Sequence, residues 1–170
     1  MREDNIILTD IDGVVLNWFY AFDVWMLEHG HERRDGVLQY DVSETYGIGK
    51  AQAKQMVRMF NESAAMGFLP PLRDAMHYMK KLHEEHGYVF HAITSQSSNP
   101  NAQKLRIMNL QKLFGETLFA KFTILGCGDD KDEALEPYRD SGYTWVEDKV
   151  ENAELGVKLG LDSLLMEHGF

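Results

Sequence analysis

A chain of 170 residues with 44% hydrophobic residues can bury one compact core, and this apolar content is too high for a disordered protein. The formal net charge of −10 argues against binding to nucleic-acid polymers or to anionic membranes, since both need a basic face. The single cysteine, Cys127, cannot form an internal disulfide, so a reducing cytoplasm is the expected location. We expect no targeting peptide in the acidic residues 1–5 and no membrane span in residues 14–27, which are too few. Composition leaves the oligomeric state open.

The first element is a short apolar run, Ile6 to Leu8, which predicts a strand buried on both faces of a parallel sheet. Asp10 and Asp12 follow it two positions apart, so both carboxylates face the same spot at the strand's end. Gly13 suits a sharp turn close to a ligand. Two carboxylates held this close repel each other and need a proton, a cation or a metal ion nearby. The alternative is a solvated turn after the strand.

The next fifty residues interrupt the sheet. Helical spacing predicts helices over residues 16–29 and 50–60, whereas residues 31–48 are predicted to be a loop. Pro70 and Pro71 end this helical region. We therefore predict a small inserted helical cap at residues 17–69 and a core domain formed by residues 1–16 and 70–170.

Strands and helices alternate regularly after the prolines. Strands are expected at 88–93, 122–125, 143–146 and 162–165, and helices at 72–86, 99–114, 131–136 and 150–159. Alternation of this kind predicts an α/β fold, a Rossmann-like three-layer core with a central parallel sheet.

Polar side chains stand where three further strands end. Thr94 and Ser95 follow the second strand, Lys131 follows the third, and Glu147 and Asp148 follow the fourth. Each has an ordinary structural explanation, as a helix cap, a solvated charge or a partner for a helix dipole. Because parallel strands end at one edge of the sheet, we expect these groups and the two aspartates to converge.

Carboxylates, a hydroxyl and an ammonium group in one place suit the transfer of a phosphoryl group to a carboxylate. Mg²⁺ held by carboxylate oxygens lowers the repulsion between the nucleophile and a phosphate dianion. The ammonium and hydroxyl groups hold the other phosphate oxygens, and a second carboxylate moves protons.

The motifs Asp10-Ile11-Asp12-Gly13-Val14-Val15, Ile93-Thr94-Ser95, Lys131 and Val146-Glu147-Asp148 resemble, in order, the four motifs of the haloacid dehalogenase (HAD) superfamily. The resemblance extends over the whole chain, with residues 17–69 in the place of the family's helical cap. The Thr-Ser pair and the small cap are similar to the 5′(3′)-deoxyribonucleotidase branch. The Glu-Asp pair is closer to the β-phosphoglucomutase-like branch.

The resemblance implies a role for each motif residue. Asp10 would be the nucleophile and a ligand of Mg²⁺, and Asp12 the general acid and base, with its backbone carbonyl also at the metal. Thr94 and Ser95 would bind the phosphoryl group and Lys131 would neutralise it. Asp148 would complete the metal site, and Glu147 would be a direct or an outer ligand.

The sequence thus predicts a Mg²⁺-dependent phosphatase that hydrolyses a small phosphomonoester, for which a nucleotide is one candidate, through an aspartyl-phosphate. A phosphomutase and a non-catalytic phosphate-binding or signalling module are the alternatives. His91, inside a strand, and Cys127, in a loop, are interpreted as structural residues. Four aromatic residues at the start of the cap belong either to its core or to the substrate cleft: Phe19, Tyr20, Phe22 and Trp25.

Overall fold

The computed structural model describes residues 5–34 and 41–167 of the chain. The strands are β1 (Ile6–Thr9), β2 (Val89–Ser95), β3 (Phe119–Leu125), β4 (Thr144–Glu147) and β5 (Asp162–Leu165). The α-helices are α1 (Trp18–Glu28), α2 (Val42–Tyr46), α3 (Lys50–Asn61), α4 (Ala75–His86), α5 (Pro100–Phe114), α6 (Asp132–Leu135) and α7 (Val150–Lys158). Two 3₁₀ helices, η1 (Ala64–Gly67) and η2 (Glu136–Tyr138), complete the described elements.

The strands form one parallel sheet with the order β3-β2-β1-β4-β5. The first strand of the chain lies in its middle, where Ile7 is paired with Phe90 on one side and with Thr144 on the other. Because helices pack on both faces of a parallel sheet, a central strand needs apolar side chains on both faces, and the Ile-Ile-Leu run provides them. The predicted α/β class with a central parallel sheet is confirmed.

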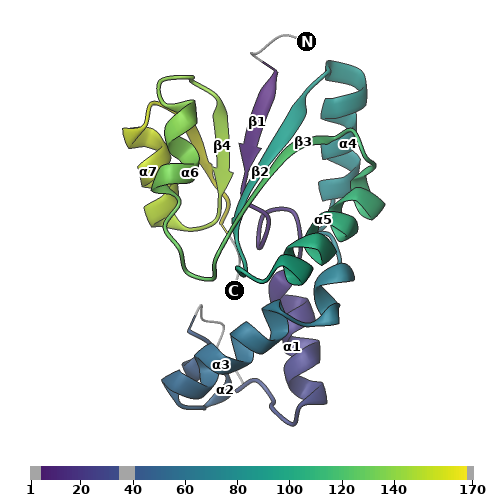
Figure 1. The fold of residues 1–170 in the computed structure, drawn as a ribbon, viewed down its shortest axis with the longest axis vertical. Helices are drawn as coiled ribbons and strands as arrows, with labels where there is room; N and C mark the ends of the chain where they lie inside the picture. Colours follow the sequence, from purple (N-terminus) through teal and green to yellow (C-terminus); the bar gives the residue numbers. More distant parts are fainter. Residues whose placement is uncertain (1–4, 35–40, 168–170) are drawn as a thin grey trace.

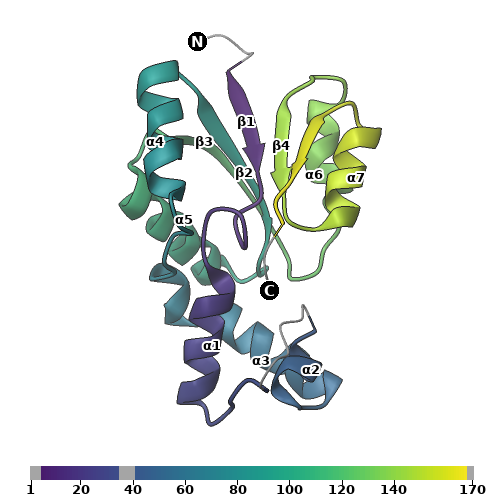
Figure 2. The ribbon, with the colours of Figure 1, turned by 180° about the vertical axis from the view of Figure 1, so that it is seen from behind.

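Helices cover both faces of the sheet and make it the middle of three layers (Figures 1 and 2). On one face, Phe90 and Phe119 pack in a buried cluster with Leu110 and Phe114 of α5. On the other face, a second cluster joins strand residues to the α6, η2 and α7 side of the molecule: Leu8, Ile93, Leu135, Tyr138, Trp145 and Leu159. Alternate residues of β1 and β2 supply the two clusters, as the period of a strand requires.

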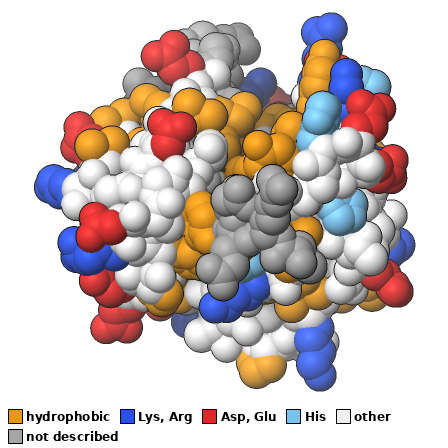
Figure 3. Space-filling model, turned by 90° about the horizontal axis from the view of Figure 1, so that it is seen from above, with side chains coloured by type: hydrophobic (Ala, Val, Ile, Leu, Met, Phe, Trp, Pro, Cys, Tyr) orange, Lys and Arg blue, Asp and Glu red, His pale blue; other side chains and the backbone are white. Residues whose placement is uncertain are grey.

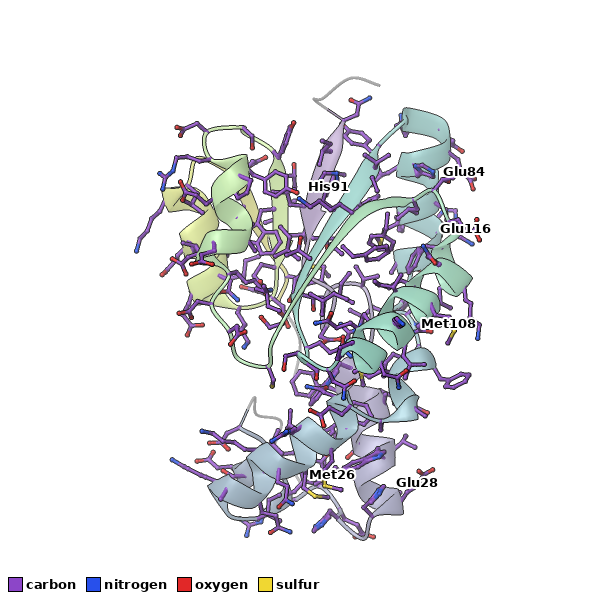
Figure 4. All side chains as sticks on the ribbon, viewed as in Figure 1. Met26, Glu28, Glu84, His91, Met108 and Glu116 are labelled. Carbon is purple, nitrogen blue, oxygen red and sulfur yellow. The ribbon has the colours of Figure 1, made fainter. Side chains whose placement is uncertain are left out.

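The segment from α1 to α3 lies beyond the carboxyl ends of the strands, towards which the strand arrows point (Figure 1). Trp18 and Phe22 of α1 stack on each other, and both contact the ring of Phe60 in α3. Met26 of α1 is fully buried in the same cluster (Figure 4). This cluster continues into Val15 beside the sheet, so the helical segment and the sheet share one buried core. The division of the chain into a cap and a core domain stays a prediction.

Most expected elements are present, with shifted ends. The loop expected at 31–48 is wrong in part, because Asp41 caps helix α2 through its side chain; residues 35–40 lie outside the described residues. Strand β3 begins at Phe119, three residues before the expected start, and its early residues Ala120 and Lys121 are exposed because β3 is an edge strand. Helix α4 begins at Ala75 because Asp74, just before it, has a left-handed backbone with a φ of 65°.

Over the described residues, the structure has no helix of the length and apolarity that crossing a membrane requires. Figure 3 looks onto the end of the molecule where the strands begin. Acidic and basic side chains alternate around the rim of this face, with hydrophobic side chains between them. The groups described next lie at the opposite end of the sheet.

Candidate active site at the carboxyl ends of the strands

Asp10 is placed by the sheet itself. Its backbone N–H donates a 2.9 Å hydrogen bond to the carbonyl of Val146 in β4, which continues the pairing of β1 by one residue. The chain then turns back on Ile11, whose carbonyl accepts hydrogen bonds from the N–H groups of Val14 and Val15. Gly13 has a φ of 80°, a conformation that side-chain-bearing residues avoid. The turn leaves Asp10 and Asp12 on the same side of the loop, facing one cleft.

Lys131, just before α6, contacts the carboxylate of Asp10, which directly follows β1, and that of Glu147 in β4. Its Nζ lies 3.0 Å from Oδ1 of Asp10 and 2.8 Å from Oε2 of Glu147, and only 4% of its side chain is exposed. Burial alone would lower the pKa of this ammonium group, but the charges of Asp10 and Glu147 more than offset that effect and raise its pKa. The lysine is therefore a fixed positive charge against Asp10.

Glu147 is completely buried, and both of its oxygens accept hydrogen bonds. Oε2 accepts from Lys131, and Oε1 accepts from the backbone N–H groups of Asp148 and Lys149 at 2.9 and 3.1 Å. The glutamate therefore fixes the start of the β4–α7 connection as well as the lysine. Asp148 lies in this connection, at the end of the sheet where the strands terminate.

Carboxylate oxygens of Asp10, Glu147 and Asp148 all lie within 4.8 Å of one another. Burial raises the pKa of Asp10 to about 6, although Lys131 opposes it, and burial likewise raises the pKa of Asp148 to about 6. A raised pKa means that the negatively charged form of each carboxyl group is unfavourable here, and a bound cation would stabilise that form. An all-oxygen set of this kind fits a hard divalent ion such as Mg²⁺. The residues present thus fit the predicted metal.

The hydroxyl groups of Thr94 and Ser95, at the end of β2, lie in different environments. Ser95 lines the cleft and donates a 3.1 Å hydrogen bond to the carbonyl of Asp129. Thr94 is 1% exposed, and its Oγ1 accepts a 3.3 Å hydrogen bond from Nη1 of Arg106. Of the two residues, Ser95 is the one that lines the cleft.

Arg106 of α5 belongs to this site and was not predicted from the sequence. It is fully buried, and its Nη2 lies 2.8 Å from Oδ1 of Asp12 and donates to Oδ2 at 3.1 Å. Burial raises the pKa of Asp12, and the guanidinium of Arg106 opposes that rise. A signal was available, since Arg106 lies four residues after Ala102 and four before Leu110, on the buried face of the helix.

A cleft of about 500 Å³ opens between the strand ends and the helical segment. Five of the predicted residues line it: Asp10, Asp12, Ser95, Lys131 and Asp148. The opposite wall includes Trp18 and Phe19 of α1 and Val57 of α3. Of the four aromatic residues considered from the sequence, Phe19 therefore faces the cleft, Phe22 is buried in the core and Tyr20 is 62% exposed. Trp25 stacks on His29 and is partly buried.

Sequence comparison finds a distant similarity between this chain and a curated protein. The chain is 27% identical over 114 residues to an uncharacterized 32.4 kDa protein of Enterobacteria phage T4. The match covers 64% of this chain but 40% of the phage protein, so the chain spans less than half of that relative. No protein-family model matches the chain.

Solved structures with the same fold include proteins described as hydrolases of the HAD family. A hydrolase from Streptococcus pneumoniae has a TM-score of 0.64 at 15% identity, over 99% of this chain and 95% of its own. A Bacillus subtilis protein described as a HAD-hydrolase, with magnesium bound, has a TM-score of 0.61 at 14% identity, over 97% and 89%. The protein CbbY of Rhodobacter sphaeroides, in complex with phosphate, has a TM-score of 0.56 at 14% identity, over 98% and 87%. The chain shares the fold of these proteins.

Proposed function

We propose that this protein is a Mg²⁺-dependent phosphatase that hydrolyses a small phosphomonoester through an aspartyl-phosphate on Asp10. The observation that carries the proposal is the contact between Lys131 and Asp10 beside a three-carboxylate cluster, all at the end of the sheet where a cleft opens. Such a cleft, of about 500 Å³, is of the size that binds small molecules. The fold and the magnesium and phosphate bound by proteins that share it support the same reading.

The metal would be held by Asp10 and Asp148, with the backbone carbonyl of Asp12. When bound, Mg²⁺ supplies positive charge that reduces the repulsion between carboxylate and phosphate dianion. Because three donors already occupy the oxygens of Glu147, we assign that residue to holding Lys131 and to an outer position at the metal. Lys131 and Ser95 would hold the phosphoryl oxygens, and the same role for the more deeply buried Thr94 stays a prediction.

The reaction has two halves. A carboxylate oxygen of Asp10 attacks phosphorus, the bond from phosphorus to the ester oxygen breaks, and that oxygen takes a proton from the carboxyl group of Asp12. Water then attacks the phosphorus of the aspartyl-phosphate and gives a proton to Asp12. Inorganic phosphate leaves and the carboxylate of Asp10 is restored. A second carboxylate at position 12 favours phosphate esters over organohalides, because a halide leaves without a proton.

The test is phosphate release from a panel of nucleotides, sugar phosphates and 4-nitrophenyl phosphate. We expect turnover with Mg²⁺, none after chelation, and a loss of at least about 10³-fold in Asp10→Asn, since removal of a nucleophile abolishes covalent catalysis. Asp162→Asn, an exposed change at the start of β5, is the matched control. No release from any substrate would overturn the phosphatase and favour a phosphate-binding module. Turnover of a sugar bisphosphate without free phosphate would indicate a phosphomutase.

A further inference from the structure

The burial of Arg106 has a high cost in free energy. Its side chain has no exposed surface, and a guanidinium keeps its charge under all ordinary conditions. Among the described residues, Asp12 is the one carboxylate within salt-bridge distance, and the Nε–H group has no hydrogen-bond partner there. The neighbouring buried positions of the same helix face hold Ala102 and Leu110. An apolar side chain at position 106 would stabilise the folded protein at least as well as the buried ion pair does.

The guanidinium touches three segments that meet under the cleft. Nη2 contacts both oxygens of Asp12 in the loop after β1, and Nη1 donates to Oγ1 of Thr94 at the end of β2. Nη2 also lies 3.7 Å from Sδ of Met66 in η1, the turn that leads out of the helical segment. The arginine therefore ties the loop of Asp12 to the strand beside it.

Asp12 is held from one side and open on the other. Its side chain is 23% exposed and lines the cleft, whereas Arg106 approaches it from the interior. A carboxylate on a turn can rotate freely about its side-chain bonds. Contact of one nitrogen with both oxygens removes that freedom without occupying the cleft. The geometry suits a group that must present a proton at one defined place.

Resting on the proposed phosphatase function, we propose that Arg106 is a positioning residue that orients the carboxyl group of Asp12 towards the ester oxygen of the substrate. It touches neither the substrate nor the phosphorus. Its effect must therefore depend on how much the leaving group needs the proton that Asp12 delivers. A residue that only stabilises the fold has no such dependence.

The test compares two substrates through kcat/KM, which reports the steps up to the release of the alcohol. An alkyl phosphate needs protonation of its leaving oxygen, whereas 4-nitrophenyl phosphate does not. We expect Arg106→Met to lower kcat/KM for the alkyl phosphate on the order of 100-fold, the effect of displacing a catalytic group slightly. The loss for 4-nitrophenyl phosphate should be below about 5-fold, within the range of an unspecific packing change. Equal losses would overturn the proposal.

Two further variants test whether the effect of Arg106 is exerted through Asp12. In an Asp12→Asn background, Arg106→Met should cause no additional leaving-group dependence, because the group being oriented is gone; an undiminished additional effect contradicts the proposal. Asn109→Ala, on the same helix, removes a buried hydrogen bond to the carbonyl of Leu69 and should lower kcat/KM for both substrates alike.

Arg106→Lys is the alternative if the methionine variant does not fold. A lysine keeps the positive charge, but its single nitrogen cannot reproduce the separate contacts of Nη2 with Asp12 and of Nη1 with Thr94. A smaller loss with the same preference for the alkyl phosphate supports the proposal, and an equal loss for both substrates overturns it. Failure of the phosphatase function itself has a separate signature. In that case the unaltered protein hydrolyses neither substrate with Mg²⁺.

Discussion

Glu147 shows how one buried carboxylate can organise a site that other residues would operate. It has no exposed surface, and it accepts hydrogen bonds from Lys131 and from the two N–H groups that follow it. The side chain of Trp145 lies under the same lysine, with its ring centre 5.2 Å from Nζ. Lys131 is thus held by Glu147 and Trp145 of β4 and by Asp10, which directly follows β1.

We expect Lys131→Met to lower the free energy of unfolding by about 3–5 kcal/mol, because it leaves the buried Glu147 carboxylate without its cation. The side chains are similar in volume, so lost packing contributes little. Urea unfolding followed by circular dichroism measures the change. Lys158→Met, an exposed lysine at the end of α7, is the control and should stay within about 0.5 kcal/mol. A destabilisation no larger than the control's would show that the buried pair contributes little.

The sequence could identify most residues of the candidate site because they stand at strand ends, where topology alone brings them together. The structure places Asp10, Lys131, Glu147 and Asp148 in contact range, and their catalytic and metal-binding roles stay predictions. The same argument could not predict that Arg106 belongs to the site. It comes from the middle of a helix, and a lysine- and arginine-containing helix is usually interpreted as having its charges in water.

At the scale of elements, the helical segment is joined to the sheet by a chain of buried hydrogen bonds. Nε1 of Trp18, at the start of α1, donates to Oδ1 of Asn61 at the end of α3, at 2.8 Å. Nδ2 of Asn61 donates to the carbonyl of Gln96, and the Gln96 side chain donates back to the carbonyl of Asn61. Gln96 follows Thr94 and Ser95 directly. The helices are therefore tied to the strand end that carries the hydroxyls.

Trp18→Phe tests this connection. It keeps the aromatic stack on Phe22 but leaves the buried Oδ1 of Asn61 without its donor, so we expect a loss of about 1–3 kcal/mol in the free energy of unfolding. Thermal and urea unfolding provide the measurement. Trp25→Phe removes the same group from a ring that is only partly buried, and it should cost less than Trp18→Phe. If the two variants lost the same stability, the hydrogen bond to Asn61 would not be the cause.

Helix α2 marks the limit of predicting elements by apolar periodicity. Five residues are too few to show a helical repeat, so periodicity predicts a loop over residues 31–48, which include this helix. The signal present is instead a capping pattern, in which Asp41 stands three residues before Glu44. In the structure, Oδ1 of Asp41 accepts hydrogen bonds from the N–H groups of Ser43 and Glu44. Short helices of this kind are specified by their ends.

For the whole molecule, alternating strands and helices were enough to predict a parallel sheet, because parallel neighbours need a crossover between them. The order of the strands was not predictable in the same way. Strand β1 lies between β2 and β4 because its Ile-Ile-Leu run can be buried on both faces, whereas β3 and β5 carry exposed residues and form the edges. Shared packing between the helical segment and the sheet also depends on contacts far apart along the chain.

The pH dependence of stability belongs to the same scale, and His91 provides a defined contribution to it. His91 lies on β2 within the sheet, away from the α1–α3 segment (Figure 4). Its Nδ1 is 2.7 Å from the hydroxyl oxygen of Tyr138 in η2. Partial burial, and after it the charge of Lys121, lower the pKa of His91 below its usual 6.5. Burial raises the pKa of the Tyr138 hydroxyl, so that group stays neutral throughout the acidic range.

The sign follows from proton linkage. The unfolded chain takes up a proton at His91 as the pH falls through about 6.5, whereas the folded protein takes it up only at lower pH. The stabilising contribution is therefore complete above pH 6.5 and is lost as the pH falls through the lowered value. We expect urea unfolding between pH 7.5 and pH 5 to show a shallower loss of stability in His91→Gln than in the unaltered protein. Tyr138→Phe keeps the histidine, so it should keep the steeper loss. The three proteins are compared with one another at each pH, so the contributions of the other titrating groups cancel. Equal slopes in all three proteins would assign the acid sensitivity to groups other than His91.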